Sequence, residues 1–545
     1  MRSDQSQRLM NTDGRYTADR RPGVAEGWRL DRVTAPSRLF GANGVRTGPD
    51  GRLYVAQVTG SQISAIDIAS GVVEIVSAKG SEIVGPDDLA FDEAGNAFAT
   101  EVMDGRVSVL DRRGQARVLR DDIPLANGIT IFGGRLFVGE CRENGRLLEL
   151  DRNGGPPRVL LENVPLPNAM EVGPDGLLYF PVMGTNQIWR IDPEGGQPEV
   201  VASNLGVPDS VKFDAEGFIV STQLHSGQVL RIDPRSGKHT VLAELDPGLD
   251  NLAFIDQRLF VSSLSGQITE VLGGGESRLL LSGGLTWPLD LEVADDGNLY
   301  VADGIYLYLL TRDGQLRTVG MLFAPGYPGF LRGLAAAGEG NFIVTTSNGQ
   351  VSRYHPARSE SEVLADGFDQ VYGVGIAPDQ TIVVAELGTG RVLAIRSGKV
   401  RTLASGLQDP VGVAIAPDGA CLVAESNAGR VVKVTTSGVE TVAEGLHSPQ
   451  GILVQDGQLF VVDSGAKAVV AFDMHTHVGQ TIAFDVPVGA PPGIIAKPLR
   501  GMPPFSGPQG PFAGISAGSD GTLYISADGD GSILALRRQN AHGHH

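Results

Sequence analysis

Short runs of alternating apolar and polar residues, joined by glycine-bearing turns, recur along the whole chain. The stretch PNAMEVGPDGLLYFPV, residues 167–182, is typical of them: an Asn leads into an apolar run, Pro-Asp-Gly makes a turn, and a second apolar run returns. Alternation on both sides of such a turn predicts a β-hairpin. The pattern returns with a period of about forty residues, which is the signature of a repeat architecture.

Each repeat contains a second pair of short runs, as in QIWRIDPEGG and PEVVASNL, and no segment has the periodicity of an amphipathic helix. One repeat therefore predicts four antiparallel strands. A meander of this size cannot bury both faces alone, and the radial stacking of blades in a β-propeller solves that problem. The first strand of a propeller blade is innermost, so its start faces the mouth of the central channel.

The repeats number twelve when they are counted by the residue that begins each first strand. These residues are Asn43, Asp87, Asn127, Asn168, Asp209, Asp250, Leu289, Arg332, Tyr372, Val411, Gln450 and Ala513. Because twelve blades around one axis would leave a wide hole, we expect an all-β chain with two six-bladed propellers in tandem, residues 41–287 and 288–540. One larger ring and a seven-plus-five division are the alternatives.

The two ends of the chain bear on how the propellers close. The last repeat supplies only three strands, and a spare strand-like segment lies in residues 28–40. We expect residues 30–36 to complete either the final blade or the sixth, because a missing strand would leave an unpaired edge. Residues 1–27 are expected to be mobile and residues 541–545 to form a tail.

Two long loops interrupt the repeat, residues 321–333 and residues 486–512. Both precede a first strand, which places them at the channel mouth of the second propeller. Loops of this length are commonly lids or contact surfaces, and a solvent-exposed insertion is the alternative.

Composition narrows the class of partner. The formal net charge is −19, which argues against nucleic acid and anionic membrane surfaces and leaves a small molecule as the expected partner. The two cysteines lie in different repeats, and no apolar run of signal-peptide length opens the chain. These features predict a cytoplasmic protein; the oligomeric state stays open.

The residues that begin the first six first strands are all Asn or Asp, whereas none of the second six is Asn or Asp. Turn chemistry explains Asn and Asp after Pro, but the second six make the same turns without them. Crowded carboxylates repel one another, and a bound cation removes that conflict. Oxygen ligands suit hard divalent ions. We expect a site for one cation at this mouth, with Ca²⁺ favoured and Mg²⁺, Mn²⁺ or Zn²⁺ as alternatives.

The repeats of residues 40–287, with PNAMEV and PDSVKF in the ring, resemble the gluconolactonase/senescence-marker-protein family and, more distantly, the paraoxonases. The resemblance implies a six-bladed propeller with a divalent cation at the channel mouth, held here by Asn43, Asn127, Asn168 and Asp209. The family has Glu where Asn43 stands, and Asp87 or Asp250 could restore that charge. The second half resembles propeller repeats of the NHL kind.

A cation at the mouth would polarise a substrate carbonyl while a carboxylate takes a proton. Asp209 is the expected general base, followed by Asp87 and Asp250, and His225 is a further acid or base. Attack by water would open a lactone or ester, which predicts a metal-dependent hydrolase. Carbon deprotonation at the same site would give a lyase, isomerase or cyclase, and a non-catalytic NHL-type binding protein is the third hypothesis.

Two further groups of residues have a simpler interpretation. Second strands end in acidic or amide residues in both halves, which favours a structural role in capping turns. In the second propeller, Arg332, Tyr372 and Gln450 stand at the mouth, where they could hold an anionic or aromatic group or belong to a plain scaffold.

Overall fold

A computed structural model describes residues 14–18 and 20–539. The predicted tail and residues 1–13 of the segment predicted to be mobile lie outside the described residues. The described part is built of short strands, and its only helical segments are the 3₁₀ turns η1 (Met183–Thr185) and η2 (Pro356–Arg358). No helix in it is long and apolar enough to cross a membrane.

The described strands form twelve antiparallel sheets, and apart from β1 and β2 the neighbours in sequence are neighbours in each sheet. Eleven sheets have four strands and one has five. This all-β arrangement of four-stranded meanders is that of propeller blades. The chain divides into two compact units: the first comprises Arg38–Thr286 with Ile495–Leu499, and the second comprises Gly14–Ser37, Trp287–Ile494 and the chain from Arg500.

The first unit contains six sheets. Their strands are β3 (Val45–Thr47), β4 (Leu53–Gln57), β5 (Gln62–Ile66), β6 (Val73–Ser77); β7 (Pro86–Phe91), β8 (Ala97–Glu101), β9 (Arg106–Leu110), β10 (Ala116–Arg120); β11 (Ala126–Phe132), β12 (Arg135–Glu140), β13 (Gly145–Leu150), β14 (Arg158–Val164); β15 (Glu171–Val172), β16 (Leu178–Val182), β17 (Gln187–Ile191), β18 (Glu199–Ala202); β19 (Pro208–Phe213), β20 (Ile219–Gln223), β21 (Gln228–Ile232), β22 (His239–Glu244); β23 (Leu249–Ile255), β24 (Arg258–Ser263), β25 (Ile268–Gly273), β26 (Glu276–Leu281).

The second unit contains the other six sheets. Their strands are β27 (Asp290–Val293), β28 (Leu299–Asp303), β29 (Tyr306–Leu310), β30 (Leu316–Met321); β31 (Leu331–Ala336), β32 (Phe342–Thr346), β33 (Val351–His355), β34 (Glu360–Ala365); β35 (Val371–Ile376), β36 (Ile382–Glu386), β37 (Arg391–Arg396), β38 (Lys399–Ser405); β39 (Pro410–Ile415), β40 (Cys421–Glu425), β41 (Arg430–Thr435), β42 (Gly438–Ala443); β43 (Pro449–Gln455), β44 (Gln458–Asp463), β45 (Ala468–Asp473), β46 (Gly479–Phe484), with β1 (Gly23–Val24); β47 (Ile515–Ala517), β48 (Leu523–Ala527), β49 (Ser532–Arg538), with β2 (Trp28–Arg32).

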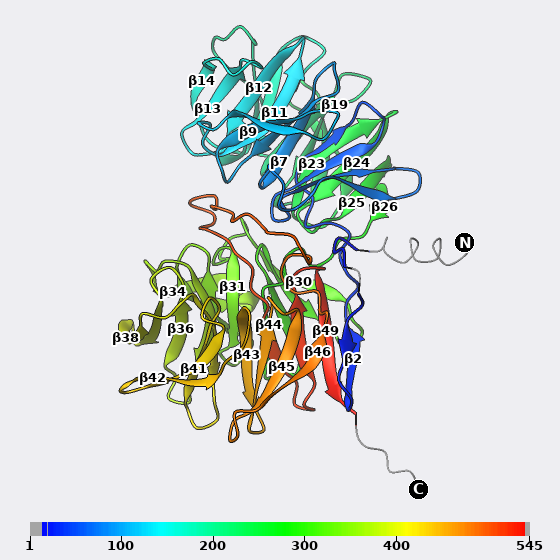
Figure 1. Cartoon of the computed structure of the whole chain (residues 1–545). Helices are drawn as coiled ribbons and strands as arrows, with labels where there is room; N and C mark the ends of the chain where they lie inside the picture. The colour runs from blue at the N-terminus through cyan, green and yellow to red at the C-terminus, as the bar shows by residue number, and fades with distance from the viewer. Residues whose placement is uncertain (1–13, 19, 540–545) are drawn as a thin grey trace, which may run out of the picture. The chain divides into compact units, whose positions relative to one another are not determined.

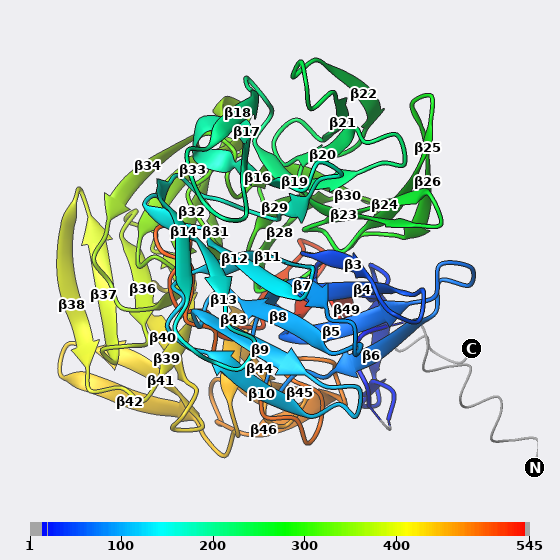
Figure 2. The same ribbon diagram turned by 90° about the horizontal axis from the view of Figure 1, so that it is seen from above.

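The first strand of each sheet packs against the first strands of its neighbours. In the first unit β3 lies against β7, β7 against β11, β11 against β15, β15 against β19, and β23 against both β19 and β3. The sheets of that unit follow one another around the view in Figure 2. In the second unit β27 and β43 both lie against β47, so there too the last sheet meets the first.

The N-terminal part of the chain belongs to the second unit. Strand β2 pairs antiparallel with β49 and supplies the fourth strand of the last sheet, and Figure 1 shows the two strands side by side. Strand β1 adds to the edge strand β46, and Arg15 is buried, donating to the carbonyls of Asp528 and Gly529. Arg15 and β1 thus make specific contacts within residues 1–27, the segment that the sequence predicts to be mobile.

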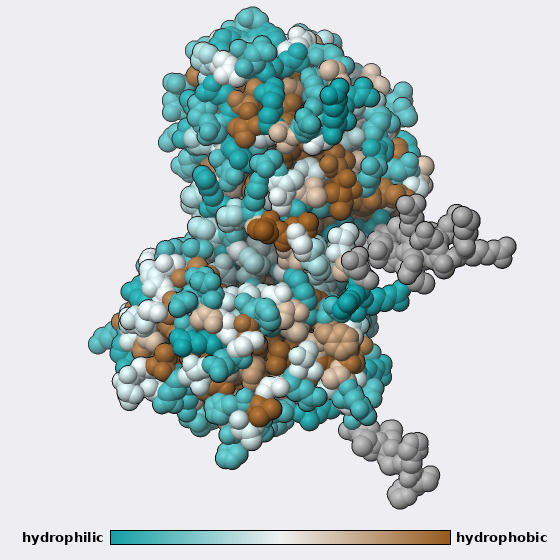
Figure 3. All heavy atoms as spheres, in the orientation of Figure 1, coloured by the Kyte–Doolittle hydropathy of each residue, from teal (hydrophilic) through white to brown (hydrophobic). Residues whose placement is uncertain are grey.

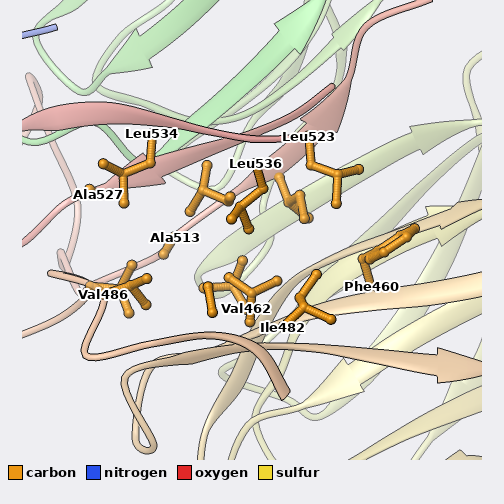
Figure 4. Packing of buried hydrophobic residues seen from close by; sticks show 14 of the residues in the cluster. Phe460, Val462, Ile482, Val486, Ala513, Leu523, Ala527, Leu534 and Leu536 are labelled. Atoms are coloured by element: carbon orange, nitrogen blue, oxygen red, sulfur yellow. The ribbon is translucent and has the colours of Figure 1, made fainter. Parts of the chain in front are cut away.

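Apolar side chains fill the space between adjacent sheets. Figure 4 shows this for the last two: Phe460, Val462 and Ile482 of one sheet face Leu534 and Leu536 of the next. Trp28 on β2 joins the same cluster. The closing strand therefore contributes core as well as hydrogen bonds.

The fourth strands are outermost and carry isolated apolar side chains. Examples are Val118, Val159, Val200, Val241, Val363, Val400 and Val439. Figure 3 shows mostly polar residues on the visible surface, with apolar residues in scattered groups. Singly exposed apolar residues are ordinary for a soluble fold.

A side chain at the end of the second strand ties down the loop before the first strand. Gln57 accepts from the backbone N–H of Phe40, Glu101 from that of Val84 and Glu386 from that of Asp369. Equivalent bonds are made by Gln223, Asp303, Glu425 and Asp463. These bonds give the predicted capping residues their role, and they fix the backbone that carries the channel mouth.

Removing residues 1–37 should destabilise the second unit, because the last sheet loses its fourth strand and the Trp28 side chain leaves the core. Loss of a buried Trp alone costs about 3–5 kcal/mol, and each kcal/mol lowers Tm by roughly 2–4 °C in a unit of this size. Calorimetry and light scattering should show a lower transition and aggregation. A truncation of residues 1–13 alone is the control; identical unfolding of the two truncated chains would contradict the closing role of β2.

Candidate metal and acid–base site at the mouth of the first unit

The six predicted ring residues occupy equivalent places in the first unit. Asp87, Asn127, Asp209 and Asp250 are each the second residue of a first strand, and Asn43 and Asn168 stand just before β3 and β15. The pairing with the second strand slips next to these residues, as between Pro86 and Leu89 in β7. Such β-bulges re-aim side chains at the ends of sheets. The repeat thus brings all six to one layer of the unit.

Small residues follow four of the six ring residues, where the first strands approach one another closely. A Cβ on Gly128 would lie 2.3 Å from the carbonyl oxygen of Asn168, and one on Gly44 would lie 2.5 Å from that of Asp87. The Gly44 N–H also donates to this Asp87 oxygen at 2.7 Å. The ring residues are therefore carried by backbones in direct contact.

Two of the amides bind carboxylates of the neighbouring sheets. Asn43 Nδ2 donates to Asp250 Oδ2 at 3.2 Å, and Asn168 Nδ2 donates to Asp209 Oδ1 at 3.1 Å. The Asn43 oxygen accepts from the Val58 N–H at 3.1 Å. Each of these carboxylates keeps one oxygen without a protein donor among the described residues.

Asn127 presents its oxygen without a partner. Its Oδ1 is buried with no hydrogen-bond partner in the described part of the chain. A buried carbonyl oxygen without a donor is costly unless a bound group satisfies it. The Asn127 oxygen is therefore available to a bound cation or hydrogen-bond donor.

The three carboxylates are buried and uncompensated. Asp87, Asp209 and Asp250 are 5–8% exposed and form no ion pair with any described residue. Burial raises the pKa of Asp87 to about 7, with a further push from Asp88. Burial also raises the pKa of Asp209 and of Asp250 well above the usual value, and repulsion from Asp87 adds to both. The mouth therefore favours a proton or a cation.

A second layer lies immediately beneath the ring and is fully paired. Asp88 accepts from the N–H groups of Leu89 and Ile129 and from Asn251 Nδ2, at 2.8, 3.1 and 3.2 Å. The Thr222 and Ser262 hydroxyls bind the backbone oxygens of Asp250 and Asn43. This layer holds the ring strands in register.

The third layer is an ion cluster that the sequence analysis does not predict. Glu171 pairs with Arg46 at 2.8 Å and with Lys212 at 3.2 Å. Arg46 also donates to the backbone oxygens of Leu89 and Ile129, both at 2.7 Å. These three charged residues each stand three positions beyond a ring residue, inside an otherwise apolar run, which is the signal that reveals them.

Residues that follow the second strands form an apolar rim beside the ring. Five of them, Val58, Val102, Cys141, Leu224 and Leu264, are buried, and Met183 is half-buried. Asn168 Nδ2 lies 3.1 Å from Met183 Sδ, which puts this rim next to the polar ring. The rim provides a low-polarity wall for the carboxylates.

His225 lies in the turn after β20, next to Leu224 of the rim. It is half-buried, and its Nε2 is buried without a partner among the described residues. The predicted acid or base is thus at the correct end of its sheet and has a nitrogen available for a ligand.

Within the long loop of residues 486–512, the segment Ile495–Leu499 belongs to the first unit. Lys497 pairs with Glu82 at 3.2 Å, and Leu499 is buried against Gly85. The remainder of the loop belongs to the second unit.

The donor set is made of oxygen only, which suits a hard divalent cation. Within the described residues no three His, Cys, Asp or Glu side chains are grouped closely enough to hold an ion by themselves. A metal set here would consequently have to use the amide oxygens of Asn43, Asn127 and Asn168 together with Asp209.

The chain matches no family model and no curated protein. Among solved structures, a streptogramin B lyase is 18% identical, with a TM-score of 0.38, over 50% of this chain and 94% of that chain. Virginiamycin B lyase from Staphylococcus aureus is 14% identical, with a TM-score of 0.35, over 58% and 96%. The extracellular domain of a hybrid two-component system from B. thetaiotaomicron is 8% identical, with a TM-score of 0.32, over 94% and 83%.

These likenesses are too weak to bear on activity. The fold class follows from the twelve antiparallel sheets. They make the described chain an all-β protein built of propeller-type blades. The resemblance to gluconolactonases stays a hypothesis.

Asp250→Asn should stabilise the chelator-treated protein at pH 7.5, because it removes one of three repelling buried charges. A carboxyl whose pKa is raised by folding stabilises the fold while protonated, so stability is lost as pH rises from about 4 through the folded pKa. Calorimetry should show a higher Tm for the variant, by roughly 2–4 °C per kcal/mol, and little difference at pH 4.5. The exposed Asp246→Asn is the control. A difference that does not depend on pH would contradict this electrostatic account.

Proposed function

We propose that the first unit is a six-bladed propeller whose mouth binds one divalent cation and hydrolyses a lactone or ester of a small molecule. The observation that supports this most is the group of three buried carboxylates without a cationic partner, beside the unpartnered oxygen of Asn127. We further propose that the second unit is also a six-bladed propeller.

Asn43, Asn127, Asn168 and Asp209 would hold the cation, with Ca²⁺ as the first choice. A bound cation would polarise a substrate carbonyl and stabilise negative charge on its oxygen. Residues of the chain itself would orient the carboxylates, accept the proton from water and exclude bulk water. Asn168 orients Asp209 through the bond to Oδ1 and leaves Oδ2 for a ligand.

Asp209, Asp87 and Asp250 are the groups that accept a proton from water. The Asp87 carboxyl accepts no hydrogen bond from a described residue, and Asp88 is the neighbour whose charge raises its pKa further. A carboxylate whose pKa lies near the working pH is an effective general base. His225 could return the proton to the leaving oxygen through Nε2. The apolar rim, which includes Val58 and Leu224, would contact the body of the substrate and exclude water.

The activity is tested with the full-length protein against δ-gluconolactone, γ-butyrolactone, dihydrocoumarin and p-nitrophenyl acetate. We expect hydrolysis of at least one of these, its loss with EDTA, and its recovery with Ca²⁺, Mg²⁺ or Mn²⁺. Metal-dependent proton exchange at a carbon next to a carbonyl, without hydrolysis, would replace the hydrolase by a lyase or isomerase. Hydrolysis that persists in EDTA would contradict the role of the cation.

Asp209→Asn should lower kcat/KM by about 10²–10⁴-fold, the usual contribution of a general base, while the calorimetric transition stays intact. Asp246→Asn, an exposed Asp of the same unit, should keep full activity. Full activity of the Asp209 variant would remove this residue as the base and leave Asp87 and Asp250 as the alternatives.

A further inference from the structure

The mouth of the second unit contains a buried arginine where the first unit has Asn or Asp. Arg332 is the second residue of β31, and its side chain is 0% exposed. Its guanidinium carbon lies 4.1 Å from the centre of the Tyr372 ring, which is the second residue of β35. Arg332 forms no ion pair with any described residue.

Part of the guanidinium is satisfied and part is not. Nη2 donates to the carbonyl of Pro508, whereas Nε and Nη1 are buried without a partner in the described part of the chain. Stacking on Tyr372 compensates only the face of the guanidinium. A buried charge whose N–H groups lack acceptors is strongly unfavourable, so the site needs an acceptor that the protein does not supply.

Other unpartnered polar groups lie at the same end of the unit. Gln450 is the second residue of β43 and is buried with its Oε1 unpaired. The Thr346 hydroxyl is buried and unpaired, and Thr346 pairs in register with Leu331, next to Arg332. Gln509 follows Pro508 and has both side-chain polar atoms buried and unpaired.

The segment of residues 500–512 covers this end of the unit. Asn348 Nδ2 donates to the Pro504 carbonyl at 2.9 Å, and the Gly507 N–H donates to Ser347 Oγ at 3.1 Å. A Cβ on Gly510 would lie 2.7 Å from the Tyr372 hydroxyl, so the loop backbone lies directly on this ring. Phe512 contacts the same ring edge-on, at 6.0 Å between ring centres.

A cavity of about 230 Å³ lies further along the first strands of the same unit. Its lining includes Leu334, Phe512, Asp290 and Glu292.

We propose that the second unit binds a small molecule carrying an oxyanion, a carboxylate or a phosphate, between Arg332 and the segment of residues 500–512. Nη2 carries two hydrogens and Pro508 takes one of them. The other Nη2 hydrogen, together with the unpaired Nε or Nη1 on the same edge, matches the two oxygens of such a group in a bidentate arrangement. Gln450, Gln509 and Thr346 would bind the remaining oxygens, and the loop would have to open to admit the ligand.

The proposal is tested by calorimetric titration and thermal unfolding of the full-length chain after overnight incubation with sodium phosphate or sodium acetate, with NaCl at matched ionic strength as the reference. We expect a saturable rise in Tm with at least one probe. A response to phosphate alone assigns a phosphate ligand, and a response to acetate alone assigns a carboxylate.

Arg332→Gln should weaken binding of the effective probe at least tenfold, whereas the exposed Arg353→Gln of the same sheet should bind as the wild type does. Gly510→Ala, which displaces the loop but keeps the arginine, should also weaken binding and provides the test if Arg332→Gln does not fold. No response beyond that to NaCl, or an undiminished response of both variants, would overturn the proposal.

Discussion

Three carboxylates buried at one channel mouth, with no protein cation among them, are the constraint on which the account of the first unit depends. A buried charge must be paired, protonated or bound to a metal. Asp250 and Asp209 receive one amide hydrogen bond each, and Asp87 receives none from a described side chain. Arg46 and Lys212 do not neutralise these carboxylates, because both form ion pairs with Glu171 deeper in the channel. The ring therefore stays available for an external cation or proton.

The repeat explains how one scaffold can carry two different sites. The same hydrogen bonds hold the loops at both mouths: Gln57 and Glu101 in the first unit act as Glu386 and Glu425 do in the second. With the backbone fixed in this way, the residue at the start of each first strand is free to vary. The first unit places Asn and Asp there, whereas the second places Arg332, Tyr372 and Gln450 at three of the equivalent positions.

The strands and the place of the ring could be predicted because hairpin alternation and a regular period are local in sequence. The pairing of β2 with the last sheet could not be decided locally, since the segment fits either of two open edges. The ion cluster of Arg46, Glu171 and Lys212 does not follow from the pattern of any single repeat. It becomes visible only when the repeats are aligned and the third residue after each ring residue is compared.

The most direct test of the central claim is elemental analysis of the protein purified without chelator, together with calcium titration of the wild type and of Asp209→Ala. The account predicts one divalent ion per chain, removed by chelation and bound far more weakly by the variant. Purified protein without any divalent ion, which also shows no binding when calcium is added, would contradict it.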